Sequence, residues 1–140
     1  MKARVKWVEA MRFVGGSGSG HGVIMDASAT PEGETTLGPS PMEMILLGMG
    51  GCTVYDVVAI LQKMRQPVED VVVELEAERA DEPPKVFTKI HAKFTVVGDV
   101  PQNKAEEAVA LSADKYCSAS RMLAHTATIT HEVTVVAKGD

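Results

Sequence analysis

One segment constrains the fold of this chain more than any other: residues 41–65 are almost continuously apolar and lie between a helix start and a helix stop. Ser40 can cap the helix, Pro41 suits its first turn, and Glu43 completes a capping box. Gln66-Pro67 ends the helix, because the residue before a proline avoids helical backbone. The predicted helix of about 25 residues would be about 37 Å long.

Apolar side chains lie on every side of this predicted helix, and a helix that is hydrophobic all round is buried all round. They are Met44, Ile45, Leu46, Leu47, Met49, Val54, Val57, Val58, Ile60 and Leu61. A single chain of 140 residues has too little other structure to enclose such a helix. We therefore expect a second subunit to cover part of it.

The N-terminal residues and the charge balance indicate a cytoplasmic protein. Residues 1–9 interleave charged and apolar side chains, unlike the apolar run of a secretory signal. Asp56 and three glycines interrupt the apolar segment, and a charge at mid-bilayer costs about 2.5–3.5 kcal/mol, so no membrane span is expected. With 14 Lys and Arg against 19 Asp and Glu, nucleic acid is not an expected partner.

Alternating residues predict three strands before this helix and three after it. The expected strands are residues 2–8, 11–14 and 21–26, a β-meander, then 71–79 and 90–96, a hairpin, and finally 127–135. A helix over residues 104–116, capped by Asn103, and a helical turn over 119–125 precede the last strand. This order predicts a single α+β domain over residues 1–140 and argues against a doubly wound parallel sheet.

The predicted hairpin carries complementary charges on its wet face. Glu74, Glu76 and Glu78 alternate with apolar residues on the first strand, and Lys89, His91 and Lys93 do so on the second. The acidic row can face the basic row and fix the register. The same alternation turns Arg79 toward the core side, unless the strand ends there and Arg79 reaches solvent.

Cys52 lies inside the long helix, directly after Gly50 and Gly51 and close to Gly48. Each glycine inside a helix costs about 1 kcal/mol relative to alanine, so some feature of the structure must offset three of them. They permit either close approach of another backbone, such as a second subunit's helix, or a small pocket beside the thiol. Cys52 is then a reactive thiol or simply a small buried hydrophobe.

Cys117 follows Cys52 by 65 residues, so the sequence alone does not say whether the two thiols meet. If they meet, they form a dithiol pair suited to redox chemistry. The four histidines, His21, His91, His125 and His131, have no metal-binding spacing among themselves or with the cysteines. No metal site is therefore predicted.

Three motifs together resemble the OsmC-like superfamily, which includes the organic hydroperoxide resistance proteins. They are Ser40-Pro41-Met42-Glu43-Met44, Gly48-Met49-Gly50-Gly51-Cys52 and Lys115-Tyr116-Cys117-Ser118. The resemblance covers nearly the whole chain and is nearest to a branch of uncertain physiological role. It implies an OsmC-like α+β fold, with antiparallel sheets wrapped around a long central helix, and an intertwined homodimer with active sites at the interface.

The resemblance also implies thiol-dependent peroxidase chemistry in oxidative-stress defence. Cys52 matches the peroxidatic thiolate, which attacks a peroxide oxygen, releases an alcohol or water and becomes a sulfenic acid. Cys117 matches the resolving thiol, which condenses with the sulfenic acid to a disulfide. An external dithiol reductant restores both thiols, and no bound cofactor is expected.

The chain departs from the family at the residues that activate the thiolate. In peroxide-reducing members a glutamate follows the helix-start proline and pairs with an arginine, whereas here that position is Met42. Glu43 is one residue later and faces away from Cys52, which favours its capping role. Three arginines remain candidates for the activating cation: Arg79 by strand periodicity, Arg12 by its place in the family, and Arg121 by its closeness to Cys117.

Two functions are consistent with these residues. The first is a cytoplasmic homodimeric peroxidase for organic hydroperoxides or hydrogen peroxide. The second is a non-catalytic dimer that binds a small apolar ligand at the subunit interface, favoured by the Met-rich helix and by Met42. A cysteine hydrolase is a weaker alternative, since no histidine has a motif that places it as a base.

Overall fold

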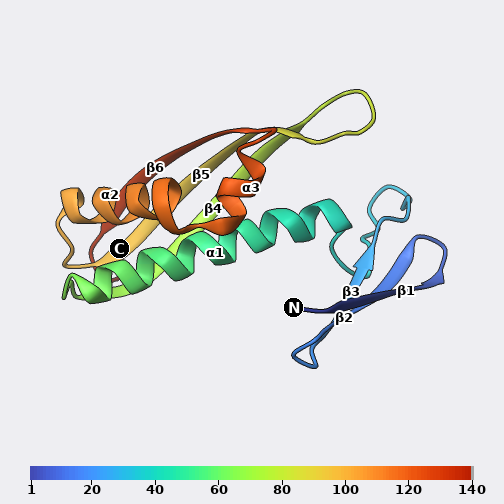
Figure 1. Ribbon diagram of the computed structural model, residues 1–140, viewed down its shortest axis with the longest axis horizontal. Helices are drawn as coiled ribbons and strands as arrows, with labels where there is room; N and C mark the ends of the chain where they lie inside the picture. The colour runs from blue at the N-terminus through green and yellow to red at the C-terminus, as the bar shows by residue number, and fades with distance from the viewer. Residues whose placement is uncertain (140) are drawn as a thin grey trace. The chain divides into compact units, whose positions relative to one another are not determined.

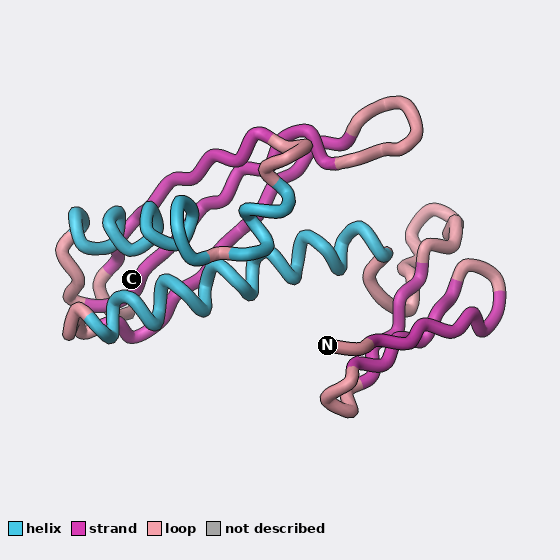
Figure 2. The backbone as a smooth tube through the Cα atoms, in the orientation of Figure 1, coloured by secondary structure: helices cyan, strands magenta, loops and turns pink. Residues whose placement is uncertain are grey.

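The computed structural model describes residues 1–139 and has the α+β class predicted from the sequence (Figure 1). It contains two compact units, Met1–Leu47 and the segment from Gly48 onward. Helix α1, Pro41–Lys63, runs from the first unit into the second. Figure 2 shows this helix as the longest helical element of the chain.

The first unit is an antiparallel sheet in the order β1-β2-β3, which confirms the predicted meander. Its strands are β1 Ala3–Glu9, β2 Arg12–Ser17 and β3 Gly22–Asp26. The alternation in β1 predicted one buried face, but all seven of its residues are exposed in this chain. Trp7, for example, keeps 63% of its surface accessible.

The second unit is a three-stranded sheet in the order β4-β5-β6 with helices on one face (Figure 1). Its elements are β4 Val68–Arg79, β5 Phe87–Gly98, α2 Gln102–Leu111, η1 Ser112–Tyr116, α3 Ser118–Leu123 and β6 Thr128–Val136. The prediction of wholly antiparallel sheets is wrong for β6, which pairs parallel to β5. The helical connection between these strands carries the chain back along the sheet, as a parallel pair requires.

The predicted charge rows of the hairpin face each other. Glu76 lies opposite His91, while Glu74 and Glu78 lie opposite Lys93 and Lys89. Ion pairs follow at 3.7 Å between Lys89 and Glu78 and at 3.4 Å between Lys93 and Glu76. The opposite face of β5 supplies the core, with Ile90, Ala92, Phe94 and Val96 all buried.

The buried stripe of α1 packs on this sheet with helical spacing. Thr53, Val57 and Leu61 are buried four residues apart, and α2 adds Ala105, Ala108 and Val109 to the same core. Gly50 allows the close approach, because a Cβ there would stand 3.1 Å from Leu75 Cδ1. Although α1 is long and apolar enough to cross a membrane, this stripe makes it a core helix.

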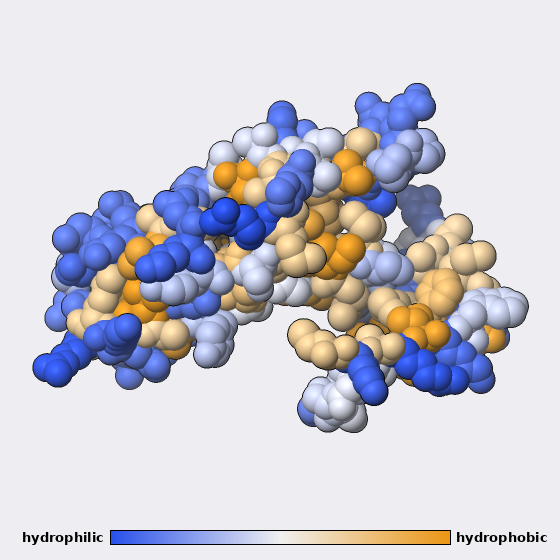
Figure 3. All heavy atoms as spheres, viewed as in Figure 1, coloured by the Kyte–Doolittle hydropathy of each residue, from blue (hydrophilic) through white to orange (hydrophobic). Residues whose placement is uncertain are grey.

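Many side chains on the other faces of α1 are exposed among the described residues 1–139. Ile45, Leu47 and Tyr55 are exposed, and a Cβ on Gly48 or Gly51 would meet open space. Figure 3 shows apolar residues reaching the surface rather than being enclosed by polar ones. These exposed side chains agree with the expectation that a second subunit covers part of this helix.

The predicted start of α1 is confirmed, whereas both predicted ends of α2 differ in the structure. The helix start at Ser40 is confirmed as a capping box: the Glu43 amide donates to Ser40 Oγ at 3.2 Å, and the Ser40 amide donates to the Glu43 carboxylate. The predicted Asn103 cap is wrong, since α2 begins at Gln102 after Pro101, whose fixed φ suits a helix start. This helix ends at Leu111, where the backbone widens into the π-helix η1.

Candidate functional site

Helix α1 places Cys52 and Asp56 on one side, next to the buried stripe. The two residues stand one helical turn apart, so their side chains share a face. Both are half-buried, between the buried Thr53 and Val57 and the exposed Gly51 and Tyr55. The helix thus presents a thiol and a carboxylate side by side at the edge of the core.

Cys117 occupies the junction between η1 and α3. Its backbone amide donates to the Ser112 carbonyl at 2.8 Å, the five-residue spacing of a π-helix, and the residue then caps α3. The amide and hydroxyl of Ser120 both donate to Cys117 Sγ, at 3.3 and 3.1 Å. The thiol is 3% exposed, so hydrogen bonds hold it in place inside the protein.

The two cysteines meet. Cys52 Sγ, Cys117 Sγ and a carboxylate oxygen of Asp56 all lie within 4.8 Å of one another, and both thiols are free. The sequence had left this juxtaposition open. The structure therefore brings together the two residues that the resemblance assigns to peroxide reduction, with a carboxylate beside them.

The surroundings separate the pKa values of the two thiols. Burial and the negative charge of Asp56 oppose ionisation of Cys52, but hydrogen bonds from the Ala119 amide, Cys117 and Ser118 lower its pKa below the ordinary value. Burial raises the pKa of Cys117, and the neighbouring Cys52 raises it further, against the Ser120 hydrogen bonds. Cys52 is therefore the thiol that ionises first.

Three serines, which the sequence analysis did not single out, each support one member of this cluster. Ser112 Oγ donates to Asp56 Oδ2 at 3.0 Å, Ser120 donates to Cys117, and Ser118 Oγ lies 3.8 Å from Cys52 Sγ. Ser118 and Ser120 follow Cys117 closely in the sequence and could have been noted as its neighbours. Ser112 gave no signal, because it lies 56 positions from Asp56 in the sequence.

Arg79 and Arg121 are both bound to backbone carbonyls. The Arg79 side chain is exposed, and its Nε donates to the Lys85 carbonyl at 2.8 Å. The predicted inward orientation of Arg79 is wrong, because the strand register shifts between Glu78 and Arg79 and the alternation does not continue through it. Arg121 donates to the Asp114 carbonyl at 3.0 Å.

Arg12, in the first unit, has the carboxylate partners that an orienting network needs. Its Nε donates to Asp26 Oδ2 at 3.1 Å, and its Nη1 lies 3.4 Å from Glu9 Oε1. Asp26 is buried and also accepts hydrogen bonds from the amides of Ser28 and Leu37. These hydrogen bonds, from Ser28 first and then Leu37, together with Arg12, hold the pKa of Asp26 well below its usual range.

A groove of about 500 Å³ adjoins the cluster through Asp56. Its apolar lining comes from one side of α1 and the end of α2, and Tyr55 and Tyr116 give it aromatic walls. The remaining lining residues are Ala59, Ile60, Lys63, Met64 and Leu111. Such a surface fits an apolar molecule next to the thiol site.

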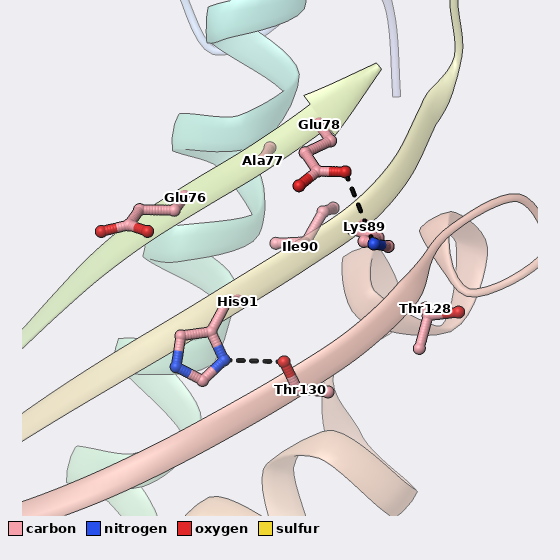
Figure 4. Close-up of a pocket in the computed structure, with 8 residues that line it drawn as sticks. All are labelled: Glu76, Ala77, Glu78, Lys89, Ile90, His91, Thr128 and Thr130. Atoms are coloured by element: carbon pink, nitrogen blue, oxygen red, sulfur yellow. Dashed lines mark hydrogen bonds and ion pairs between the residues drawn. The ribbon is translucent and has the colours of Figure 1, made fainter. Parts of the chain in front are cut away.

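A second hollow, of about 450 Å³, lies on the sheet and differs in chemistry (Figure 4). There His91 Nδ1 lies 2.7 Å from Thr130 Oγ1, its Nε2 lies 3.4 Å from Glu132, and Lys89 pairs with Glu78. Its charged groups thus neutralise one another across the strands. This is the pattern of a solvated sheet face rather than of a reactive centre.

Comparison with known proteins gives consistent matches over the chain. The family described as OsmC-like protein matches residues 32–132. Protein YhfA of Escherichia coli (strain K12) is 49% identical over 138 residues, 98% of this chain and 99% of its own length. A hypothetical protein from Aquifex aeolicus VF5 has a crystal structure with a TM-score of 0.80, 29% identity and 96% of both chains covered.

The peroxide-related relatives are more distant. The structure of an organic hydroperoxide resistance protein OsmC from Legionella pneumophila superposes with a TM-score of 0.72, at 20% identity and with 96% of each chain covered. At that identity the match supports the shared fold.

Proposed function

This chain belongs to the OsmC-like family, and from that premise we propose that it is a cytoplasmic, homodimeric thiol peroxidase for organic hydroperoxides or hydrogen peroxide. The observation that carries the proposal is the meeting of Cys52 and Cys117, within 4.8 Å and with pKa values shifted in opposite directions. A reactive thiolate beside a protonated partner is the arrangement that a two-cysteine peroxidase needs.

The chemistry follows from the two protonation states. The Cys52 thiolate attacks the distal oxygen of ROOH, the O–O bond breaks, and ROH leaves after taking up a proton. Cys52 is then a sulfenic acid. Cys117 attacks that sulfur, a water molecule is expelled, and a Cys52–Cys117 disulfide forms. A dithiol reductant supplies two electrons and two protons to restore both thiols.

Hydrogen bonds from residues of α3 assist the attack of the Cys52 thiolate on the peroxide. The Ala119 amide and the Ser118 hydroxyl favour the thiolate form of Cys52. A cation would favour it further, and Arg12 is our preferred candidate because Asp26 and Glu9 orient its guanidinium. Arg79 is the alternative that strand periodicity had favoured.

A homodimer is supported by what the single chain leaves uncovered. The exposed Leu47 and Tyr55, together with the open space at Gly48 and Gly51, give α1 a face on which a second copy can pack closely. The OsmC-like family to which the chain belongs is typically dimeric. We propose that each chain forms one OsmC-like domain over residues 1–140. We also propose that each active site is completed at the interface between two such chains.

Peroxide consumption with a dithiol reductant tests the proposal. The wild type should turn over an organic hydroperoxide, and Cys52→Ser should abolish turnover. Without the reductant, Cys117→Ser should consume about one equivalent and then stop with a sulfenic acid at Cys52, because its resolving thiol is missing. After one equivalent of peroxide, peptide mass mapping should find the intrasubunit disulfide in the wild type. Equal peroxide consumption by wild type and Cys52→Ser would refute the peroxidase.

The groove beside Asp56 supports a second candidate, a non-catalytic dimer that binds a small apolar ligand. A fluorescent apolar probe should then bind to the wild type, and Ile60→Asp, which places a charge in the groove, should weaken binding at least tenfold. Lys93→Gln on the sheet face is the matched control. Binding without peroxide turnover would favour this function over the first.

A further inference from the structure

The thiol pair has a third potential metal ligand within reach. The two sulfurs and the Asp56 carboxylate oxygen lie within 4.8 Å of one another. In tetrahedral zinc sites, Zn–S bonds of about 2.3 Å and Zn–O bonds of about 2.0–2.2 Å place neighbouring ligand atoms about 3.5–3.8 Å apart. Rotamer adjustments of about 1 Å would bring all three atoms onto one ion.

The donor set selects the kind of metal. Two thiolates are soft ligands that favour Zn²⁺ over Mg²⁺ or Ca²⁺, which prefer several oxygen donors. The carboxylate oxygen of Asp56 lies within 4.8 Å of both sulfurs, so the cluster places three potential anions close together. This negative charge is favourable when a divalent cation lies between the three groups.

The serines supply the outer hydrogen bonds that metal ligands need. Ser112 donates to Asp56, Ser120 donates twice to Cys117, and Ser118 Oγ lies beside Cys52 Sγ. Metal ligands in proteins are generally oriented by such donors, whose loss weakens metal affinity about 10- to 100-fold. Each of the three ligands therefore has its own support.

We propose that the reduced protein binds one Zn²⁺ ion through Cys52, Cys117 and Asp56, with the fourth position open to water. Both sulfurs bind the metal as thiolates, so a thiol that is still protonated releases its proton on binding. The disulfide has no thiolate to offer and does not bind the metal. Zinc and peroxide then compete for the same sulfurs, so bound zinc blocks peroxide reduction. This consequence rests on the proposed peroxidase function. The zinc site itself rests only on the cluster of Cys52, Cys117 and Asp56.

Zinc titration tests the site directly. The full-length protein, reduced with a phosphine, is titrated with Zn²⁺ against a chromophoric chelator and without peroxide. We expect one ion per chain, loss of binding in Cys52→Ser and in Cys117→Ser, and at least tenfold weaker binding in Asp56→Asn. Asp114→Asn is the matched control, because Asp114 is exposed and its side chain lies outside the cluster.

Further readouts separate coordination from folding. Asp56→Glu keeps a carboxylate and should bind more tightly than Asp56→Asn, and Co²⁺ should give a sulfur-to-metal charge-transfer band that disappears on oxidation. Wild-type affinity in Asp56→Asn, or zinc binding to the disulfide form, would overturn the proposal. Peroxide turnover is measured separately with a chelator present: turnover without zinc binding removes only the metal site, and zinc binding without turnover removes only the peroxidase.

Discussion

Arg12 and Asp26 lie directly opposite each other on strands β2 and β3, and Arg12 Nε donates a hydrogen bond to Asp26 Oδ2 at 3.1 Å. The carboxylate is buried, whereas about a third of the arginine side chain is exposed. The carboxylate partner of this arginine thus comes from a neighbouring strand, while the helix-start position carries Met42. Arg12 has a fixed orientation without the family's glutamate.

If Arg12 is the cation that activates Cys52, substitution of Arg12 or of Asp26 should raise the apparent pKa of the Cys52 thiol. Arg12→Met should raise the apparent pKa of Cys52 alkylation by about one unit, which slows alkylation about tenfold at pH 6. Asp26→Asn should act in the same direction, because it releases the guanidinium. Arg79→Met is the control. An unchanged profile in Arg12→Met, with a raised pKa in Arg79→Met, would transfer the role to Arg79.

Asp26 should also shape the acid stability of the protein. Its pKa is lower in the folded protein than in the unfolded chain, so its contribution to stability is fully present above about pH 4 and is lost as the pH falls through the folded pKa. Urea unfolding of wild type and Asp26→Asn should show a constant stability difference from pH 5 to pH 8. That difference should become smaller below pH 4. A difference in stability that grows as the pH falls would contradict a lowered pKa of Asp26 in the folded protein.

The two thiols should react in a fixed order with an alkylating reagent. Cys52 should be modified first at neutral pH, since its pKa is lowered and that of Cys117 is raised. Asp56→Asn removes a nearby negative charge and should accelerate Cys52 alkylation at pH 7 about two- to fivefold. Mass spectrometry with a chelator present measures both, with Asp114→Asn as control. Preferential labelling of Cys117 would contradict this order.

The core of the second unit should depend on Leu61. This side chain is fully buried between the sheet and α2, so Leu61→Ala should destabilise the protein by about 2–5 kcal/mol in chemical denaturation. Leu37→Ala is the matched control, because Leu37 is exposed and its substitution should change stability by less than about 0.5 kcal/mol. Equal effects would show that the helix does not pack as described.

Sedimentation should give a particle of about 30 kDa, twice the 14.9 kDa of the chain. Gly51→Leu should shift it toward the monomer at micromolar protein, since the added side chain fills the open face of α1. Circular dichroism should show retained helix content in that variant. A wild type that sediments as a stable monomer would exclude the dimer.

Local patterns predicted the elements whose residues interact with sequence neighbours. The capping box at Ser40, the meander and the facing charge rows of the hairpin all depend on short spacings and are confirmed. The parallel pairing of β6 and the inward turn of Arg79 were mispredicted, because both depend on features that local alternation does not encode: a long crossover and a register shift.

The candidate site was predicted in its members but not in its geometry. Cys52 and Cys117 were recognised through motifs, yet their meeting depends on how α1 and the segment after α2 pack on one sheet face. The contacts of Ser112 with Asp56 and of Ser118 with Cys52 also depend on that packing, whereas the contact of Ser120 with Cys117 is local. No spacing within the sequence reports a hydrogen bond between Asp56 and Ser112, which are 56 positions apart.

The π-helix before Cys117 makes the site sensitive to chain length rather than to composition. A π turn contains about one residue more than an α turn, and each residue of a helix rotates the chain by about 100°. Deleting one of residues 113–116 would close η1 into ordinary α-helix. Every cysteine and serine of the cluster would remain in the sequence. Five residues of a π turn and four of an α turn each complete about one turn, so Cys117 would keep its direction after that deletion. An inserted residue, or closure to α-helix without a deletion, would instead turn the Cys117 thiol about a quarter turn away from Cys52, so insertions here are more damaging than most substitutions.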